Sequence, residues 1–156
     1  MPDTPIENIA RGVLIYRDAL LVCRNVKHGH IFLPGGHIEP GEPARVALQR
    51  EMQEELGVDM KATDFLGVCE ASFVQQHKSG PRRHHEINCV FRLEVAELPP
   101  EQVAGLASQE RAITFDWIAE VLNNDQSPVL LPDGIDAFVR NAGRSENAPS
   151  FVSAWL

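Results

Sequence analysis

Three glutamates lie close together at the end of one predicted helix. In the stretch GHIFLPGGHIEPGEPARVALQREMQEELGV, Glu51, Glu54 and Glu55 come just before Gly57. Glutamates three or four positions apart face one another on a helix and repel, by about 0.2–0.5 kcal/mol per pair. Glu54 and Glu55 also oppose the helix dipole in the last turn. Because a divalent cation would remove these penalties, the spacing predicts a metal site, and its oxygen ligands favour Mg²⁺ or Mn²⁺ over zinc.

The predicted helix runs from about Pro43 to Leu56, since proline suits its start and Gly57 its C-terminal end. On a helical wheel its apolar stripe consists of Ala44, Ala47, Leu48, Met52 and Leu56. The three glutamates fall at the edge of this stripe, where a lower dielectric constant strengthens their repulsion. A simple solvated acidic face is therefore the weaker interpretation.

A tight glycine turn precedes the helix. Gly35 and Gly36 follow a short predicted strand, and residues without a side chain let the backbone come close to whatever the glutamates hold. No Gly-Lys-Ser/Thr follows, which excludes a nucleotide-binding P-loop. His28, His30 and His37 lie nearby in the sequence, but without cysteine partners or HExxH spacing they do not indicate zinc.

Strands and helices are interleaved around this segment. A hairpin is predicted about Arg17–Asp18, and two strands at 64–76 and 85–95 are joined through a turn at 77–84. The remaining predicted elements are a strand at 112–118, a short helix at 119–124 and a helix at 132–143. We expect an α/β fold with a mixed sheet and helices on both faces.

The whole chain, 156 residues long, fits one domain over residues 1–156. Residues 1–8 and 142–156 are candidate tails, and the last residues could instead dock on the body or on a partner subunit. With 14 basic and 22 acidic residues, the net charge of −8 is the wrong balance for binding a nucleic acid polymer. Three cysteines without CxxC spacing, no signal peptide and no apolar run of about 18 residues indicate a cytoplasmic protein without a membrane partner.

The spacing around the helix resembles a family signature. Gly36, five residues, Glu42, seven residues and then REMQEELGV match the signature of the Nudix hydrolases at every defined position. The resemblance covers residues 36–58 directly and implies the Nudix α/β/α sandwich, with a mixed β-sheet between helices. It also implies a MutT-like enzyme that uses Mg²⁺ or Mn²⁺ to hydrolyse a diphosphate linkage in a nucleoside diphosphate attached to another group.

The same resemblance assigns roles to individual residues. Glu51, Glu54 and Glu55 would be metal ligands, and one of them would be the base that activates water. The backbone carbonyl of Gly35 or Gly36 would complete the coordination.

Two supporting roles follow from the resemblance. Arg50 and Glu42 would pair and so orient the helix and its loop. An additional acid would come from outside the signature, and Glu110 and Glu86 are the two candidates. The alternatives are a solvated loop end for Glu110 and an outward strand position for Glu86.

The basic stretch HKSGPRRH is a candidate for steering an anionic substrate. Lys78, Arg82 and Arg83 supply three positive charges within six residues. An acidic protein needs such a local patch, because its overall field repels a polyphosphate. The alternative is a solvated hairpin tip formed by residues 79–81.

The substrate stays open at this point. Some Nudix subfamilies carry a tyrosine or a proline downstream of the signature, whereas here the only tyrosine is Tyr16 and the first proline after the signature is Pro81. The expected partner is a small nucleotide or other diphosphate, and a homodimer is a further expectation. A catalytically inactive nucleotide sensor and an isomerase acting on isopentenyl diphosphate are alternatives on the same fold, and both would be expected to show an eroded signature.

Overall fold

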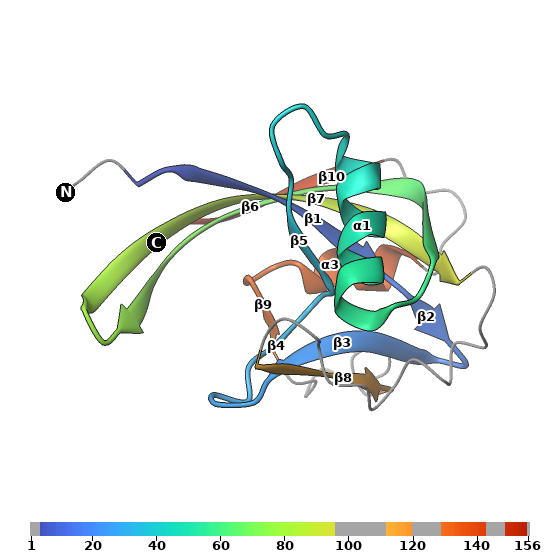
Figure 1. Ribbon diagram of the computed structural model, residues 1–156, viewed down its shortest axis with the longest axis horizontal. Coiled ribbons are helices and arrows are strands. Elements are labelled where there is room, and N and C mark those ends of the chain that lie inside the picture. Colours follow the sequence, from blue (N-terminus) through green and yellow to red (C-terminus); the bar gives the residue numbers. More distant parts are fainter. Residues whose placement is uncertain (1–3, 96–111, 120–128, 143–148, 156) are drawn as a thin grey trace.

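The structure is a computed structural model and describes residues 4–95, 112–119, 129–142 and 149–155 (Figure 1). Its helices are α1 (Ala44–Leu56) and α3 (Asp136–Ala142). Its strands are β1 (Ile6–Val13), β2 (Ile15–Tyr16), β3 (Ala19–Asn25), β4 (Ile31–Phe32), β5 (Gly35–His37), β6 (Met60–His77), β7 (Gly80–Val95), β8 (Ile113–Ile118), β9 (Leu130–Leu131) and β10 (Ser150–Trp155). Neither described helix is long and apolar enough to cross a membrane.

The strands form two mixed sheets, which confirms the expected mixed architecture. Sheet A has the order β10-β6-β7-β1-β5, and sheet B has the order β2-β3-β4-β9 with β8 paired to β3. In sheet A, β1 runs parallel to β7 and β10 parallel to β6, whereas β6 and β7, and β1 and β5, are antiparallel. Strand β5 is therefore an edge strand of sheet A, and the loop after it leads into α1.

Helix α1 forms where the sequence pattern predicts it. Its buried apolar residues are Ala47, Leu48, Met52 and Leu56. Pro43 occupies the N-cap position, and Gly57 ends the helix in the left-handed conformation with a φ of 68°. The apolar face of α1 packs on sheet A, where it joins a core that includes Phe91 and Leu93 of β7.

The other face of sheet A packs against α3, and sheet B contributes residues to the cores on both faces. Val90 of β7 and Cys69 of β6 share a buried cluster with Val22 of β3 and Phe138 of α3. Because side chains alternate along a strand, Val90 and its neighbour Phe91 point to opposite faces. Sheet A therefore separates two cores, one under α1 and one under α3 (Figure 1).

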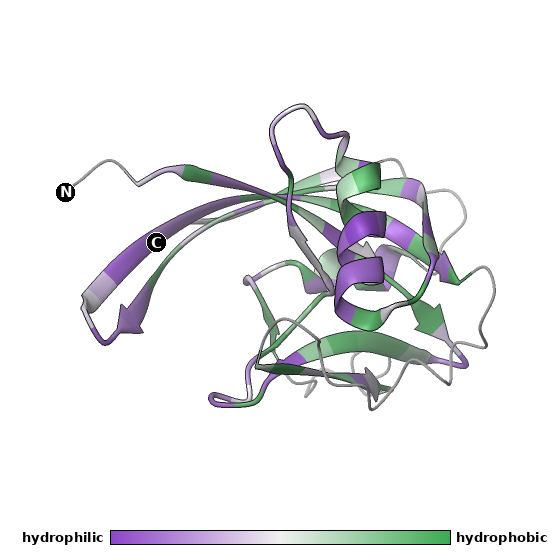
Figure 2. Ribbon diagram, viewed as in Figure 1, coloured by the Kyte–Doolittle hydropathy of each residue, from purple (hydrophilic) through white to green (hydrophobic). Residues whose placement is uncertain are grey.

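The β6–β7 hairpin is longer than the sequence predicts. Its pairing continues to His77 and Gly80, so the turn consists of residues 78–79, and Arg82 and Arg83 lie in β7. The prediction of a longer turn is wrong because ladder hydrogen bonds extend through polar residues that carry no strand signal of their own. The hairpin projects from the body, and its tip is hydrophilic (Figures 1 and 2). We call this projection, residues 72–86, the arm.

Both ends of the described chain join sheet A. Strand β1 begins at Ile6, and residues 150–155 pair in parallel with residues 67–72 of β6. Of the two expectations for the C-terminal segment, docking on the body is observed for residues 150–155. Gly67 permits the close approach, since a Cβ there would lie 2.0 Å from the carbonyl oxygen of Ser150.

The later predicted elements are found in part. The strand expected at 112–118 is β8, and the helix expected at 132–143 is the shorter α3. The short helix expected at 119–124 lies outside the described residues from position 120 onward.

Candidate active site

The glycine loop, residues 35–43, lies directly against α1. A Cβ on Gly36 would lie 2.2 Å from Cδ of Glu51 and 2.5 Å from each of its carboxylate oxygens. A side chain at position 36 would have to displace the Glu51 carboxylate. Gly35 and Gly36, which the sequence places in a tight turn, lie in β5, and the backbone at Gly36 lies against the Glu51 carboxylate itself.

The carboxylate cluster, Glu51, Glu54 and Glu55, differs in burial along the helix. Glu51 is 5% exposed and Glu55 is 0% exposed, whereas the side chain of Glu54 is 40% exposed. Two carboxylates inside the protein are costly unless other groups stabilise their charge. The wheel places all three glutamates at the edge of the apolar stripe, and the structure buries Glu51 and Glu55 but leaves Glu54 exposed.

Arg50 joins the loop to the helix. It donates to both carboxylate oxygens of Glu42, at 2.8 and 3.0 Å, and to the backbone carbonyl of His37 at 3.1 Å. The hydrogen bond from Arg50 lowers the pKa of Glu42, and the same bond raises the pKa of Arg50. The expected pairing of Arg50 with Glu42 is therefore present, in the bidentate form that arginine favours.

The same guanidinium reaches the carboxylate cluster. Nη1 of Arg50 lies 3.0 Å from Glu51 and 3.1 Å from Glu54. Within the described ranges, no three His, Cys, Asp or Glu side chains are already arranged to hold a metal ion. The oxygen-only donors, the burial of two of them and the close approach of the Gly36 backbone to Glu51 nevertheless fit a hard divalent ion. Nη1 of Arg50 occupies one oxygen of Glu51 and one of Glu54, and each carboxylate has a second oxygen.

Glu86 lies on the other side of the sheet. It is 8% exposed and shares the face of β7 that carries Val90, whereas Gly36 and Glu51 lie on the α1 side. The structure therefore buries Glu86 but does not bring it directly to the carboxylate cluster. Glu110, the other candidate for an additional acid, lies outside the described residues.

The basic residues of the arm are spread along it. Lys78 and Arg82 are exposed, and Arg83 is half-buried with Nη1 donating to the hydroxyl oxygen of Ser72 at 3.4 Å. These three basic residues thus lie on a projecting hairpin whose strands, β6 and β7, belong to sheet A.

A carboxylate that the sequence analysis does not single out links the arm to the glycine loop. Oε2 of Glu7 lies 2.8 Å from Nδ1 of His84, and its Oε1 lies 3.6 Å from Nε2 of His37. Burial alone would raise the pKa of Glu7, but the hydrogen bonds and positive charge of the two histidines outweigh it and lower the pKa.

Arg11 and Asn88 are further polar residues that the pattern does not reveal. Both are buried on the face of sheet A away from α1, and Asn88 is 0% exposed. The one sequence signal for Arg11 is a charge inside the apolar run IARGVLI. Its partners come from distant parts of the chain and cannot be read from that run.

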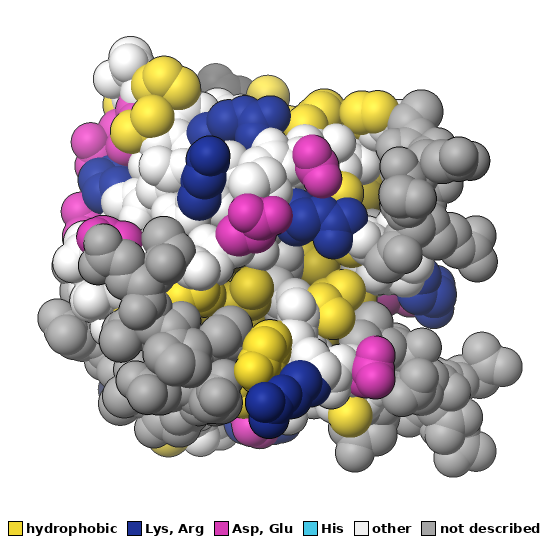
Figure 3. All heavy atoms as spheres, turned by 90° about the vertical axis from the view of Figure 1, so that its right-hand side faces the viewer, with side chains coloured by type: hydrophobic (Ala, Val, Ile, Leu, Met, Phe, Trp, Pro, Cys, Tyr) yellow, Lys and Arg dark blue, Asp and Glu magenta, His cyan; other side chains and the backbone are white. Residues whose placement is uncertain are grey.

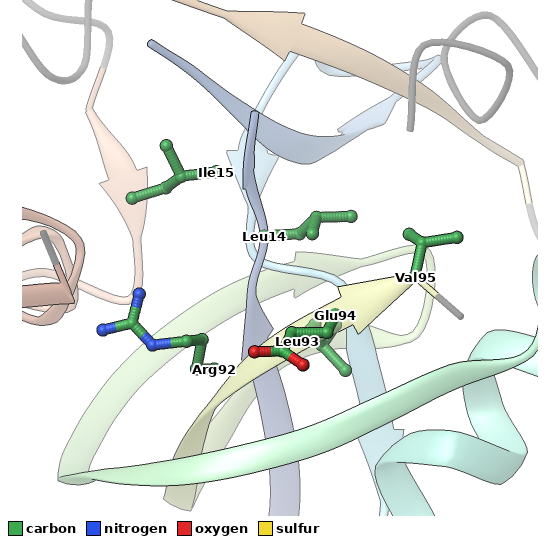
Figure 4. Close-up of a pocket in the computed structure, with 6 residues that line it drawn as sticks. All are labelled: Leu14, Ile15, Arg92, Leu93, Glu94 and Val95. Atoms are coloured by element: carbon green, nitrogen blue, oxygen red, sulfur yellow. The ribbon is translucent and has the colours of Figure 1, made fainter. Parts of the chain in front are cut away.

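A shallow depression of about 390 Å³ lies at another end of the molecule, where β1 meets β2 and β7 ends. Its lining consists of Leu14, Ile15, Arg92, Leu93, Glu94 and Val95 (Figure 4). On this side of the molecule hydrophobic side chains lie in a hollow between charged ones (Figure 3). None of the predicted site residues lines this depression.

Comparisons with known proteins identify relatives of this chain. Residues 7–131 match the NUDIX domain. The mRNA-decapping protein D10 of fowlpox virus (strain NVSL) is 36% identical over 69 residues, 44% of this chain and 29% of that protein. Nudix hydrolase 3 of Caenorhabditis elegans is 26% identical over 132 residues, 81% of this chain and 45% of that protein. The chain thus spans less than half the length of either relative.

A solved structure shows the same fold. The MutT protein from Methanosarcina mazei Go1 superposes with a TM-score of 0.61 at 18% identity, over 92% of this chain and 97% of that one. This likeness confirms the α/β/α sandwich expected from the signature.

Proposed function

The chain belongs to the Nudix family, and we propose that it is a hydrolase that cleaves a diphosphate linkage in a nucleoside di- or triphosphate derivative with the help of a divalent metal ion. One observation carries the proposal. Glu51 is buried against the glycine loop, Glu55 is buried on the same helix, and Arg50 joins Glu42, Glu51 and Glu54 in one network.

The carboxylate cluster and the carbonyl oxygen of Gly35 or Gly36 are the groups that would hold Mg²⁺ or Mn²⁺. When bound, such an ion neutralises charge on the diphosphate and acidifies water. The burial of Glu51 and Glu55 strengthens every electrostatic interaction at this place.

The chain's own residues then carry out the proton transfer and the positioning. One carboxylate of the cluster takes a proton from water while the water oxygen forms a bond to phosphorus. The bridging P–O bond breaks, and its electron pair leaves with the departing phosphate group. Arg50 keeps the loop and helix in register during this step, because misplacement by about 1 Å can cost about a hundredfold in rate.

The substrate is proposed as a small nucleotide or other diphosphate. The viral relative is named for mRNA decapping, so a capped RNA oligonucleotide belongs in the same test. The three cysteines carry free thiols, which supports the expectation of a reducing, cytoplasmic compartment.

The experiment is a panel of nucleoside triphosphates, nucleotide sugars, dinucleoside polyphosphates and capped RNA, incubated with Mg²⁺ and with EDTA. We expect release of phosphate or nucleoside monophosphate only with Mg²⁺. Glu54→Gln should abolish turnover while the protein stays folded, and Glu39→Gln, an exposed glutamate of the glycine loop, should retain it. Binding without turnover by the wild type would instead identify the inactive sensor.

A further inference from the structure

Arg11 of β1 carries a buried positive charge. The residue is 8% exposed, and its guanidinium lies over the ring of Phe32 with Cζ 5.6 Å from the centroid. Nε donates to Oδ1 of Asn88 at 3.1 Å, and Nη1 donates to the carbonyl oxygen of Leu33 at 3.1 Å. A guanidinium has five N–H groups, so these two bonds leave the donors of Nη2 for another acceptor.

The charge of Arg11 has no direct counter-charge. Among the residues that the structure describes, none of the Asp and Glu side chains forms an ion pair with Arg11. Glu86 is connected to it only through Asn88, whose Nδ2 donates to Oε2 of Glu86 and to the carbonyl oxygen of Cys69, each at 3.2 Å. A buried cation without a paired anion is unfavourable, and an anionic ligand relieves that cost.

The position of Arg11 relates it to the reaction. In the β1–β5 ladder Arg11 pairs with Gly35, and the next residue, Gly36, lies against Glu51. The guanidinium thus lies beneath the edge strand on whose other face the carboxylate cluster begins. A ligand that reaches both places must pass around this edge strand.

We propose that Arg11 binds a phosphoryl oxygen of the substrate and that Asn88 positions its guanidinium for this contact. This inference rests on the proposed function for the identity of the ligand. A phosphoryl oxygen is favoured over a neutral base or sugar group, because an unpaired guanidinium gains most from a full negative charge and presents its donors as a fork.

The test measures the binding of inorganic pyrophosphate to the full chain in EDTA by titration calorimetry. We expect the wild type to bind and Arg11→Met to bind at least about tenfold more weakly, as the loss of a charge-assisted hydrogen bond predicts. Arg24→Met removes the same charge from an exposed side chain, 3.6 Å from Asp116, and should bind like the wild type. Unchanged pyrophosphate affinity in Arg11→Met, or no binding by the wild type, would overturn the proposal.

Two further measurements keep the result decisive. If circular dichroism shows that Arg11→Met does not fold, Arg11→Lys replaces it, because lysine keeps the charge and loses the fork. We then expect binding several-fold weaker than wild type, and equal binding would contradict the proposal. Adenosine and guanosine should bind equally to wild type and variant, and a loss confined to the nucleosides would assign Arg11 to the base instead.

The outcome is separable from that of the proposed function. Pyrophosphate binding in EDTA does not depend on turnover. A chain that hydrolyses nothing in the panel but loses pyrophosphate binding in Arg11→Met would retain this site and lose the proposed activity. If the wild type hydrolyses nucleotides and Arg11→Met binds pyrophosphate as tightly as the wild type, the proposed activity stands and the Arg11 site is refuted.

Discussion

Gly36 and Glu51 restrict one another at the scale of single residues. The loop backbone comes so close to the carboxylate that any Cβ at position 36 displaces it. We expect Gly36→Ala to unfold more easily by about 1–3 kcal/mol, the usual cost of overpacking. The variant should also lose activity, because the Glu51 carboxylate would be displaced from the position in which we propose that it binds the metal ion.

A double-mutant cycle checks this contact by thermal unfolding. If the two residues collide as described, Gly36→Ala should cost less in a Glu51→Ala background than alone. Equal costs in both backgrounds would show that the loop moves away freely.

Cys69 offers a test of the core on the α3 side. Burial raises the pKa of this thiol to about 11, and the nearby charge of Glu86 adds to the shift. At pH 8 the group is therefore almost entirely protonated and also 0% exposed. We expect no alkylation of Cys69 by iodoacetamide in the native protein and full alkylation in urea, measured by peptide mass spectrometry. Rapid native labelling would mean that this core opens locally.

Some site residues are readable from sequence and others are not. The spacing of Glu51, Glu54 and Glu55 is local, so a helical wheel predicts that they share one edge of the helix, although not that Glu54 alone is exposed. Arg11 and Asn88 are 77 positions apart and meet only because β1 lies parallel to β7. A single charged residue in an apolar strand has no periodic signal that could reveal such a partner.

Arg50 links helix α1 to the glycine loop. One side chain holds the loop at Glu42 and His37 and the helix at Glu51. Arg50→Lys keeps the charge but cannot form this fork, so the loop should shift relative to the helix. We expect kcat to fall by about a hundredfold, the cost of a misplacement near 1 Å, with a smaller change in KM. Steady-state kinetics would show this. A rise in KM of similar size with an unchanged kcat would instead assign Arg50 to substrate binding.

The arm is the second element with a predicted role. Arg82→Ala combined with Arg83→Ala should raise KM several-fold and flatten its salt dependence, because fewer charges attract an anionic substrate. Lys61→Ala with Arg140→Ala removes the same charge elsewhere and should leave KM nearly unchanged. Kinetics at low and high salt decide the question. If the two double variants behave identically, the basic residues of the arm have no specific role in attracting the substrate.

The full length of the arm could not be predicted from the sequence. The apolar parts of 64–76 and 85–95 carry a strand signal, and both are strands. Residues such as Gln75 and Arg82 face each other only because the ladder continues past the core. Pairing of this kind is set by the neighbouring strand and not by the residues' own propensities.

At the scale of the whole molecule, β10 completes sheet A from the far end of the chain. It adds backbone pairing along residues 67–72 of β6 and covers that edge. We expect a chain truncated after Ala148 to melt at a lower temperature and to aggregate, because an uncovered strand edge pairs with other molecules. Phe151→Ser, which changes a side chain that is 65% exposed and leaves the strand in place, should do neither. Calorimetry and light scattering would test this, and an equally stable, monodisperse truncated chain would contradict it.

The parallel pairing of β1 with β7 sets an order of events during synthesis. Ile6 lies opposite His85, so β1 is synthesised about 80 residues before this neighbour exists. Its other neighbour, β5, emerges much earlier, together with the glycine loop and then α1. The nascent chain therefore carries the whole carboxylate cluster before sheet A is complete. Such long-range closure is slow. The apolar strands of the incomplete sheet therefore stay uncovered until β7 and then β10 have been synthesised.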